Sequence, residues 1–596
     1  MGLDRNQSSS AALTVAGAPF ISSLLIGLLC LLFFLVPLFP DIRLIRPKLL
    51  LLESGLFSIA FVWLAAQFFS GLISLRRSLL SLPLICYGIA EAVFYFLSPD
   101  RPIAASEMLR TLLSLSAYLL IANIILSEKE RNTVFLAALS GSFLASVYGI
   151  LQHFGGLGRL EVPLMDRAMS TFGNPIFFAA HLVIVIPVAL GLLFSLRRNN
   201  ERFLLLLLII SAVAALYYTQ TRAAYLGFVV SLVVFLLLII ESRKVKFFLF
   251  SLIVVLFIFF VFFTRHIWLR QQAHFLIWRD TLVMWAHHPW IGTGSGTFHI
   301  YFPQFASERL KSIWPQEQFI VNDAHNEFLQ YLSETGIIGF GIFAWLIITF
   351  FVHARKVFAG ISGYDRFLVA GLIASASGIL VQNIFSVDMR FIISAVYLFL
   401  LMGFIDTFNN DSWKLKISPL PLRVAGIVAV AAAAGFTYPV IFAPYFAQRK
   451  VSSTPDFFEA RLLEPAKTIS DLEELATRYP DQAVIHEKLG WVYSKEKNWP
   501  KAIENFERAV DLNPKLAGPL NNLGNIYYLM GNRPMAIGYW NRSLAINPQQ
   551  IDSRLNLAIA YYYQGELRES AEQLKVILKT DPKNEKAIVL LRQMTE

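Results

Sequence analysis

Residues 322–340, NDAHNEFLQYLSETGIIGF, place one histidine among polar side chains at the start of a long apolar run. A neutral imidazole can take a proton from a hydroxyl group near pH 7. His325 is therefore the candidate catalytic base of the chain. Asn326 and Glu327 follow it directly and are candidates to orient either the imidazole or a bound sugar.

The same stretch predicts a helix that starts near His325, with Asn322 or Asp323 as its N-cap. Glycines at positions 336, 339 and 341 are expected to permit close helix packing. Glu334 has no assigned role beyond a structural one. A capped histidine at a membrane interface, with no chemistry, is the simpler alternative for any single histidine.

Two arginines in other loops favour chemistry over that alternative. Arg222 stands between two apolar runs, and its planar guanidinium suits a phosphate group. Arg167 lies a few residues before GNP, where Asn174 predicts the N-cap of a helix beginning at Pro175. Either arginine can instead be an ordinary interfacial residue. A base and several guanidinium groups on one membrane face make a coherent site for a lipid pyrophosphate.

The segment 265–334 holds further candidates. Tryptophans and apolar residues between Trp278 and Trp285 recur at helical spacing, which predicts a helix along the membrane surface. GTGSG resembles a phosphate loop, but no Lys-Ser/Thr follows it, so nucleotide binding is rejected. The histidines here show no metal-ligand spacing, and we expect neither a metal nor another cofactor.

Composition sets the class of protein. The chain has 596 residues, 56% of them hydrophobic, with a mean hydropathy of +0.56. These values exceed those of soluble domains and predict an all-α, polytopic transmembrane bundle. The net charge of +10 lies largely in short loops between apolar runs, so it indicates membrane orientation and not nucleic-acid binding.

About 12–13 membrane spans are expected, each of roughly 20 apolar residues. The pair separated only by TQTR is the least distinct. The candidate spans are 19–40, 50–74, 78–98, 109–127, 133–153, 174–196, 203–219, 224–240, 246–264, 335–353, 367–386, 391–408 and 424–446, after a polar tail at 1–18.

Lysines and arginines predict a cytoplasmic N-terminus. Six of the loops that this places inside are basic, whereas DIRLIRPK breaks the rule with Arg43, Arg46 and Lys48. The outer loops are then 154–173 and 265–334. Everything after the last span is also expected outside the cytoplasm.

From about residue 447 the chain becomes charged and repetitive. Leu489, Leu523 and Leu557 are 34 residues apart, and small residues, aromatic residues and prolines keep the same period. This pattern resembles the tetratricopeptide repeat, with repeats at about 483–516, 517–550 and 551–584. Such an array is either a scaffold or a binding surface for a protein partner.

AHNEFLQYLSETGIIG, preceded by WRDTLVMWAHHPWIGTGSGTF, resembles the signature of the O-antigen ligase and polymerase superfamily. TRAAYLGF and RAMSTFGNP fit its other recurring stretches. The resemblance implies a metal-independent glycosyltransferase of the bacterial inner membrane with a glycan on undecaprenyl pyrophosphate as donor. The acceptor is implied to be lipid A–core for a ligase, another lipid-linked glycan for a polymerase, or a protein for an oligosaccharyltransferase.

By the same resemblance, His325 matches the base, while Arg222 and Arg167 match donor-binding arginines. One position departs from the family, because His274 stands where an arginine is usual. Arg270 or Arg279 is expected to supply that second pyrophosphate contact, with Arg279 preferred.

Two other classes of protein stay open at this point. Glu53, Glu91 and Arg110 lie in or near early spans and either pair with other helices or line a transport pathway. A transporter would favour internal inverted repeats, which the sequence does not show. A non-catalytic scaffold would use the repeat array as its working part.

Overall fold

The computed structural model describes residues 19–40, 47–157, 160–161, 167–248, 251, 255, 272–313, 321–387, 393–409, 411–452, 468–478, 480, 483–514, 516–548, 550–581 and 584–594. Contacts within the chain divide it into two compact units, 1–446 and 447–596. Each unit is described by itself.

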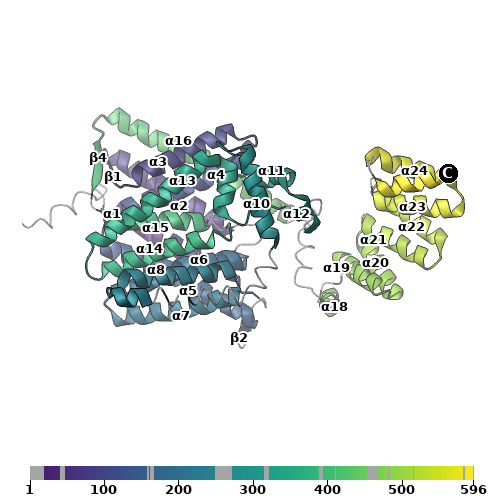
Figure 1. Ribbon diagram of the computed structural model, residues 1–596, viewed down its shortest axis with the longest axis horizontal. Coiled ribbons are helices and arrows are strands. Elements are labelled where there is room, and N and C mark those ends of the chain that lie inside the picture. The colour runs from purple at the N-terminus through teal and green to yellow at the C-terminus, as the bar shows by residue number, and fades with distance from the viewer. Residues whose placement is uncertain are drawn as a thin grey trace, which may run out of the picture. The chain divides into compact units, whose positions relative to one another are not determined.

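The first unit is a bundle of apolar helices (Figure 1). Its elements are α1 (Pro19–Leu35), α2 (Pro47–Ser70), β1 (Leu72–Arg76), α3 (Ser81–Leu97), α4 (Arg101–Ile124), α5 (Glu128–Phe154), β2 (Gly156–Leu157), β3 (Leu160–Glu161), η2 (Ser170–Phe172), α6 (Pro175–Ser195), α7 (Asn199–Thr219), α8 (Arg222–Ile239), α10 (Gln272–His287), α11 (Phe298–Phe305), α12 (Glu308–Ile313), α13 (Glu327–Gly360), α14 (Asp365–Gln382), α15 (Ile393–Asp406), β4 (Ser412–Lys416) and α16 (Leu420–Ser452).

Among the described residues, nine helices are long and apolar enough to cross a membrane, and α1, α3 and α15 are shorter apolar helices. These helices coincide with the predicted spans, except that 246–264 lies almost wholly outside the described residues. The prediction of an all-α, multi-pass membrane protein is confirmed.

The two spans joined by TQTR are separate helices. α7 ends at Thr219, Gln220 takes the left-handed conformation with φ 51°, and α8 begins at Arg222. The predicted start of α6 is also confirmed, because the side chain of Asn174 accepts a hydrogen bond from the Ile176 N–H ahead of a helix starting at Pro175.

Helix α14 lies at the centre of the bundle against α6 and α8. Glycines allow this close approach: a Cβ on Gly371 would lie 2.5 Å from the Pro187 carbonyl oxygen of α6. A Cβ on Gly227 of α8 would lie 2.7 Å from the Gly378 oxygen of α14. Any larger residue at these positions would push the helices apart.

One end of the bundle, here called the site end, is where α6, α8 and α13 begin and where α7 and α14 end. Contacts join these helix ends: the Ala168 N–H donates to the Tyr218 carbonyl, and the Glu327 N–H donates to the Asn383 carbonyl at 3.0 Å. Helices α10, α11 and α12 lie toward this end, on the right of the bundle in Figure 1.

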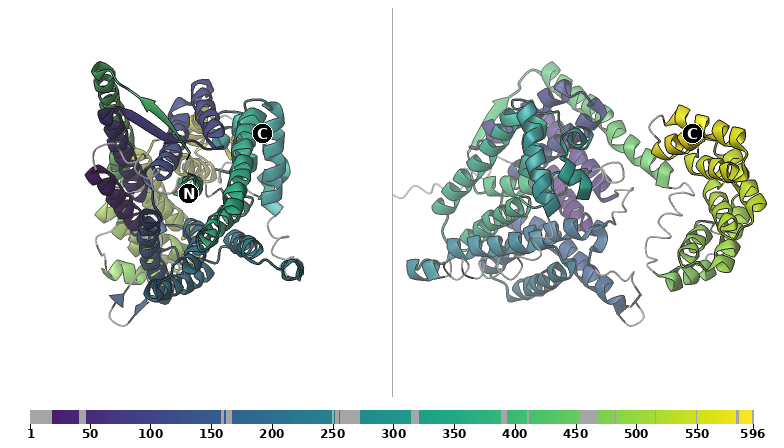
Figure 2. Two further views of the ribbon diagram at one scale, coloured as in Figure 1. Left: turned by 90° about the vertical axis from the view of Figure 1, so that its left-hand side faces the viewer. Right: turned by 45° about the vertical axis from the view of Figure 1, so that its right-hand side comes forward.

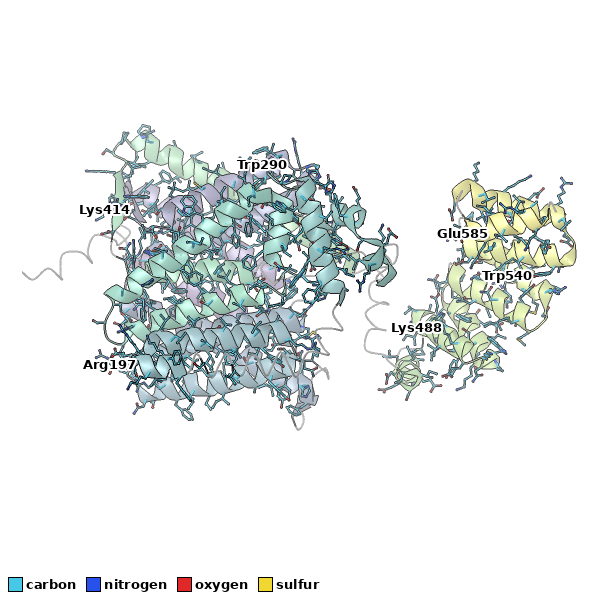
Figure 3. The ribbon with its side chains drawn as sticks, viewed as in Figure 1. Arg197, Trp290, Lys414, Lys488, Trp540 and Glu585 are labelled. Atoms are coloured by element: carbon cyan, nitrogen blue, oxygen red, sulfur yellow. The ribbon has the colours of Figure 1, made fainter. Side chains whose placement is uncertain are left out.

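The opposite end carries the basic residues of the predicted inner loops. Arg131 pairs with Asp365 at 2.9 Å, and Arg366 lies 3.7 Å from Glu241. Figure 3 shows Arg197 and Lys414 at this end. β1 and β4 also pair here, antiparallel, and the buried Arg76 of β1 donates to carbonyl groups at the ends of α4 and α15.

The second unit is a curved stack of helices (Figure 2). Small residues let paired helices cross closely, because a Cβ on Gly490 would lie 2.7 Å from the Phe506 ring. The helices are α18 (Ile469–Arg478), α19 (Ala483–Lys495), α20 (Trp499–Leu512), α21 (Ala517–Leu529), α22 (Arg533–Ile546), α23 (Ile551–Gln564), α24 (Leu567–Thr580) and α25 (Glu585–Gln593).

Trp540→Ala is expected to destabilise this second unit by about 3–5 kcal/mol, because it leaves a large cavity in a packed core. Trp540 is 2% exposed and its Nε1–H donates to Asn525. Thermal unfolding of the full chain, with limited proteolysis of the repeats, measures the loss. Trp491→Ala is the matched control, since Trp491 is 42% exposed. Equal effects of the two substitutions would contradict this packing.

Candidate active site

His325 lies just before α13 and not within it. Its φ is 50°, a left-handed conformation that is uncommon for a residue with a side chain. The helix begins at Glu327, and its N-cap is Asn326, whose side chain accepts from the Leu329 N–H. The predicted caps, Asn322 and Asp323, are wrong, because the left-handed turn at His325 comes between them and the helix.

Asp323 has a different contact, which the sequence did not assign. Its Oδ1 lies 3.0 Å from Nδ1 of His325 and accepts the backbone N–H of the same residue at 2.9 Å. A carboxylate on Nδ1 keeps the proton there and leaves the lone pair on Nε2. The side chain of His325 is 36% exposed, so Nε2 can meet a substrate hydroxyl.

His274 of α10 lies flat against His325. The two ring centroids are 4.5 Å apart with an interplanar angle of 15°. Burial, followed by the neighbouring His325, lowers the pKa of His274 to about 4, although Asp323 acts in the opposite direction. His274 is therefore neutral at pH 7.

A turn at residues 383–386 joins the helices that carry the candidate residues. The Glu327 N–H donates to the carbonyls of Asn383 and Ser386. Phe385 meets Trp278 of α10, with ring centroids 5.9 Å apart. A Cβ on Gly227 of α8 would lie 3.2 Å from Gln382, just before this turn. The start of α13, which follows His325, and the first turns of α8 are thus both anchored to the C-terminal end of α14.

Arg222 begins α8 and is exposed at the site end. Arg167 donates from Nε to the Thr219 carbonyl at 2.9 Å and from Nη2 to the Thr221 hydroxyl at 3.1 Å. Burial chiefly lowers the pKa of Arg167, Tyr225 opposes this, and the charge of Arg222 lowers it further. Arg167 thus holds the turn that presents Arg222.

Lys48, one of the basic residues that departed from the expected charge distribution of the loops, has a structural role. It is fully buried, and its Nζ donates to the Thr171 hydroxyl at 3.1 Å and lies 3.2 Å from the centre of the Phe172 ring. Lys48 therefore holds the RAMSTFGNP segment in place. Arg43 and Arg46 lie outside the described residues.

The other predicted donor contacts have different surroundings. Arg279 pairs with the adjacent Asp280, whose second oxygen accepts from Ser307. Five residues along an α-helix turn through about 140°, so Arg279 does not share the helix face of His274. Arg270 lies outside the described residues. Donor contacts of Arg279 and Arg270 therefore stay predictions.

Helix α13 is broken at Gly336, where φ is 63° and ψ is −171°. The break pairs with the HHPWIGTGSG segment: the Ile337 N–H donates to the Pro289 carbonyl, and the Gly294 N–H donates to the Glu334 carbonyl. A Cβ on Gly336 would lie 2.3 Å from Trp290 backbone atoms. Gly336 thus serves a helix break, so the prediction of close helix packing is wrong at this position. Within the part of the chain that the structure describes, no atom lies within 4 Å of a Cβ placed on Gly341, so a packing role of Gly341 stays a prediction.

Glu334 gains a role from this break. Its carboxylate is buried and accepts the backbone N–H groups of Gly296 at 2.9 Å and Phe298 at 3.1 Å, together with the Gln330 amide. The GTGSG loop does resemble an anion-binding loop, and its anion is a side chain of the same chain. The GTGSG loop and the segment that contains His325 and Glu334 are thus joined, and their contacts hold the first turns of α13 in place.

Glu334→Ala is expected to destabilise the first unit by about 2–4 kcal/mol, because it leaves buried backbone N–H groups without their charged acceptor. Thermal unfolding of the purified protein in detergent measures the change. Glu308→Ala is the control, since the Glu308 side chain is 90% exposed and pairs with Lys311 of its own helix. A stable Glu334→Ala protein would contradict the structural role.

The early charged residues are part of the same buried region. Glu91 accepts from the Tyr331 hydroxyl and from Ser295 at 3.4 Å, and Arg110 pairs with Glu107. The contacts of Glu91 join α3 to α13 and the GTGSG loop, whereas the Arg110–Glu107 pair lies within α4. Among the described residues, no group of three His, Cys, Asp or Glu side chains is arranged to hold a metal ion.

Two known family models match parts of the chain. Residues 205–344 match the family model described as O-antigen ligase, a range that includes α8, α10 and the first half of α13. The chain carries an O-antigen ligase domain. Residues 490–531 match the TPR repeat model, so tetratricopeptide repeats follow the ligase domain, as predicted. The ligase domain lies in a multi-pass helical bundle, which indicates a membrane enzyme of the glycosyltransferase type.

No curated protein matches the chain. Among solved structures, a thermophilic TPR protein of Thermus thermophilus is 20% identical over 28% of this chain and 95% of its own, with a TM-score of 0.20. The APC/C hetero-tetramer Cut9-Hcn1 is 13% identical over 92% of both chains, with a TM-score of 0.22. The assignment of the repeats rests on the 34-residue period and the family match.

Proposed function

We propose that the protein is an O-antigen ligase that transfers a glycan from undecaprenyl pyrophosphate to lipid A–core on the outer face of the bacterial inner membrane. The observation that supports this most is the Asp323–His325 pair, which lies within the matched ligase domain at the end of the bundle where Arg222 is exposed. The clustering of basic residues at the other end supports an orientation with the site outside the cytoplasm.

The proposed reaction is a single displacement. Nε2 of His325 takes the proton of the acceptor hydroxyl, and the oxygen attacks the anomeric carbon. The bond from that carbon to the pyrophosphate oxygen breaks, and undecaprenyl pyrophosphate leaves. Attack opposite the leaving group inverts the anomeric centre.

Two arginines serve this reaction in different ways. Arg222 binds the pyrophosphate and stabilises the charge that builds on it as the bond breaks. Arg167 acts on the donor through the turn that it holds, since two of its nitrogen atoms already bind Thr219 and Thr221. No step calls for a metal ion.

The surface glycans of a deletion strain test this proposal. For a ligase, long glycan chains are expected to accumulate on the lipid carrier, and the wild-type gene restores their attachment. Accumulation of single repeat units would assign a polymerase, and loss of a glycosylated protein with normal lipopolysaccharide would assign a protein oligosaccharyltransferase. Either result would overturn the ligase proposal.

The repeat domain is proposed to lie outside the cytoplasm and to bind a protein partner. The exposed Trp491, flanked by Lys488 and Lys495 at 4.7 and 4.3 Å from its ring, supports a binding surface. Transfer activity that survives a stop after residue 447, with loss of correct localisation, would make the repeats a docking module. Loss of activity in the isolated membrane domain would give them a part in the reaction.

A further inference from the structure

His274 has no role in the reaction as proposed so far, yet its ring covers one face of the proposed base. It comes from a different element, since His274 lies on α10 and His325 precedes α13. The rings are nearly parallel, with centroids 4.5 Å apart. The contact therefore depends on how α10 is held against α13.

Two contacts of residues that follow His274 along the chain anchor α10. Trp278, one turn beyond His274, packs its ring against Phe385. Asp280 is 2% exposed and accepts both the backbone N–H and the hydroxyl of Ser307, at 2.9 and 2.8 Å. These contacts fix the height and rotation of α10 and so hold the backbone that carries His274.

The relative orientation of the two rings shows whether the histidines can exchange a proton or only pack against each other. Ring nitrogen lone pairs and N–H bonds lie in the ring plane. Parallel rings at 15° therefore present faces to each other and not nitrogen atoms. A stack of this kind does not pass a proton from one ring to the other, but it does set the plane of the second ring.

We propose that His274 is a positioning residue that holds the His325 ring so that Nε2 faces the acceptor hydroxyl, and whose neutral ring face stabilises the imidazolium that forms there. Asp323 binds Nδ1 in the ring plane, and His274 supports the ring from its face. A neutral aromatic face attracts a cation, whereas a second cation at the same place would oppose its formation. This inference rests on the proposed function of His325.

The protonation state of His274 agrees with this role. Among the described residues, the titratable groups that act on His274 are His325 and Asp323. Burial and His325 hold the pKa of His274 near 4, so the ring is neutral throughout the pH range in which an unperturbed histidine titrates. In the proposed reaction the pair can therefore take up one additional proton, on His325, without a second positive charge beside it.

Three substitutions of His274 test the inference in the full chain in membranes, with kcat and donor KM measured across pH. His274→Phe keeps a neutral face and is expected to lose no more than about threefold in kcat. His274→Ala removes the face and is expected to lose about 10- to 100-fold in kcat at unchanged donor KM. His274→Arg places a cation against the same ring and is expected to move the acid limb of the pH profile to lower pH.

His287→Ala on the same helix is the control, because its ring lies at the exposed end of α10 against Phe305. Equal losses in His274→Phe and His274→Ala would show that a ring nitrogen is needed and would overturn the inference. So would normal kcat in His274→Ala, or a donor KM that rises in its place. Full activity of His325→Ala would instead remove the proposed function itself, and this inference with it.

Discussion

Replacing His325 with alanine is expected to lower kcat for glycan transfer by about 10²–10⁴-fold while the KM for the lipid-linked donor changes little. In the proposed reaction the imidazole takes the acceptor proton and has no contact with the pyrophosphate. Because its side chain is 36% exposed, the substitution removes little buried surface and the fold is expected to persist. Steady-state transfer from a labelled donor in membrane vesicles measures both constants.

Asp323→Asn tests whether the carboxylate on Nδ1 of His325 is needed for the proposed base. The amide cannot accept a charge-assisted hydrogen bond from Nδ1, so the preference for the tautomer with the proton on Nδ1 is expected to weaken. As a result, kcat is expected to fall by about 10- to 100-fold. His287→Ala controls for loss of a histidine elsewhere in the segment between α8 and α13. Normal kcat in both His325→Ala and Asp323→Asn would remove the base from the mechanism.

Arg222→Lys is expected to lower kcat/KM by about 10- to 100-fold, and Arg222→Ala by more. Lysine keeps the positive charge but loses the planar pair of N–H donors that fits two phosphate oxygens. The same vesicle assay measures the effect. Donor affinity measured in the inactive His325→Ala protein, with and without Arg222→Lys, shows how much of the loss in kcat/KM comes from weaker donor binding.

Arg198→Lys is the matched control for Arg222. Arg198 precedes α7, at the other end of that helix from Arg222, and its side chain is 84% exposed. The control is expected to transfer glycans at the wild-type rate. If Arg222→Lys behaves like Arg198→Lys, a general positive charge suffices and the guanidinium fork has no part in donor binding.

Local signals explain why the fold was largely predictable from the sequence. Apolar runs of bilayer length predict the helices, including the closely spaced α7 and α8, because each run must satisfy its own backbone hydrogen bonds in a membrane. The Asn174–Pro175 start of α6 is also local chemistry, since the cap and the first helical residue are adjacent. The 34-residue period identifies the repeats for the same reason.

The features that sequence patterns do not predict depend on contacts between distant segments. The break at Gly336 exists because the backbone of Trp290 passes within reach of it, and a glycine pattern alone does not distinguish a break from close packing. Likewise, the stack of His274 on His325 joins two elements that are about 50 residues apart along the chain. Lys48 is an exception to the charge rule because it is buried beside Phe172, which its sequence neighbours do not indicate.

The most direct test is whether the protein itself breaks the bond between glycan and pyrophosphate. Purified protein in vesicles, given a labelled lipid-linked donor and acceptor in the presence of a chelator, provides that measurement. We expect one undecaprenyl pyrophosphate released for each glycan joined to the acceptor, with no release by the His325→Ala protein. Movement of intact donor across the membrane without release would contradict the proposed transfer and indicate a transporter.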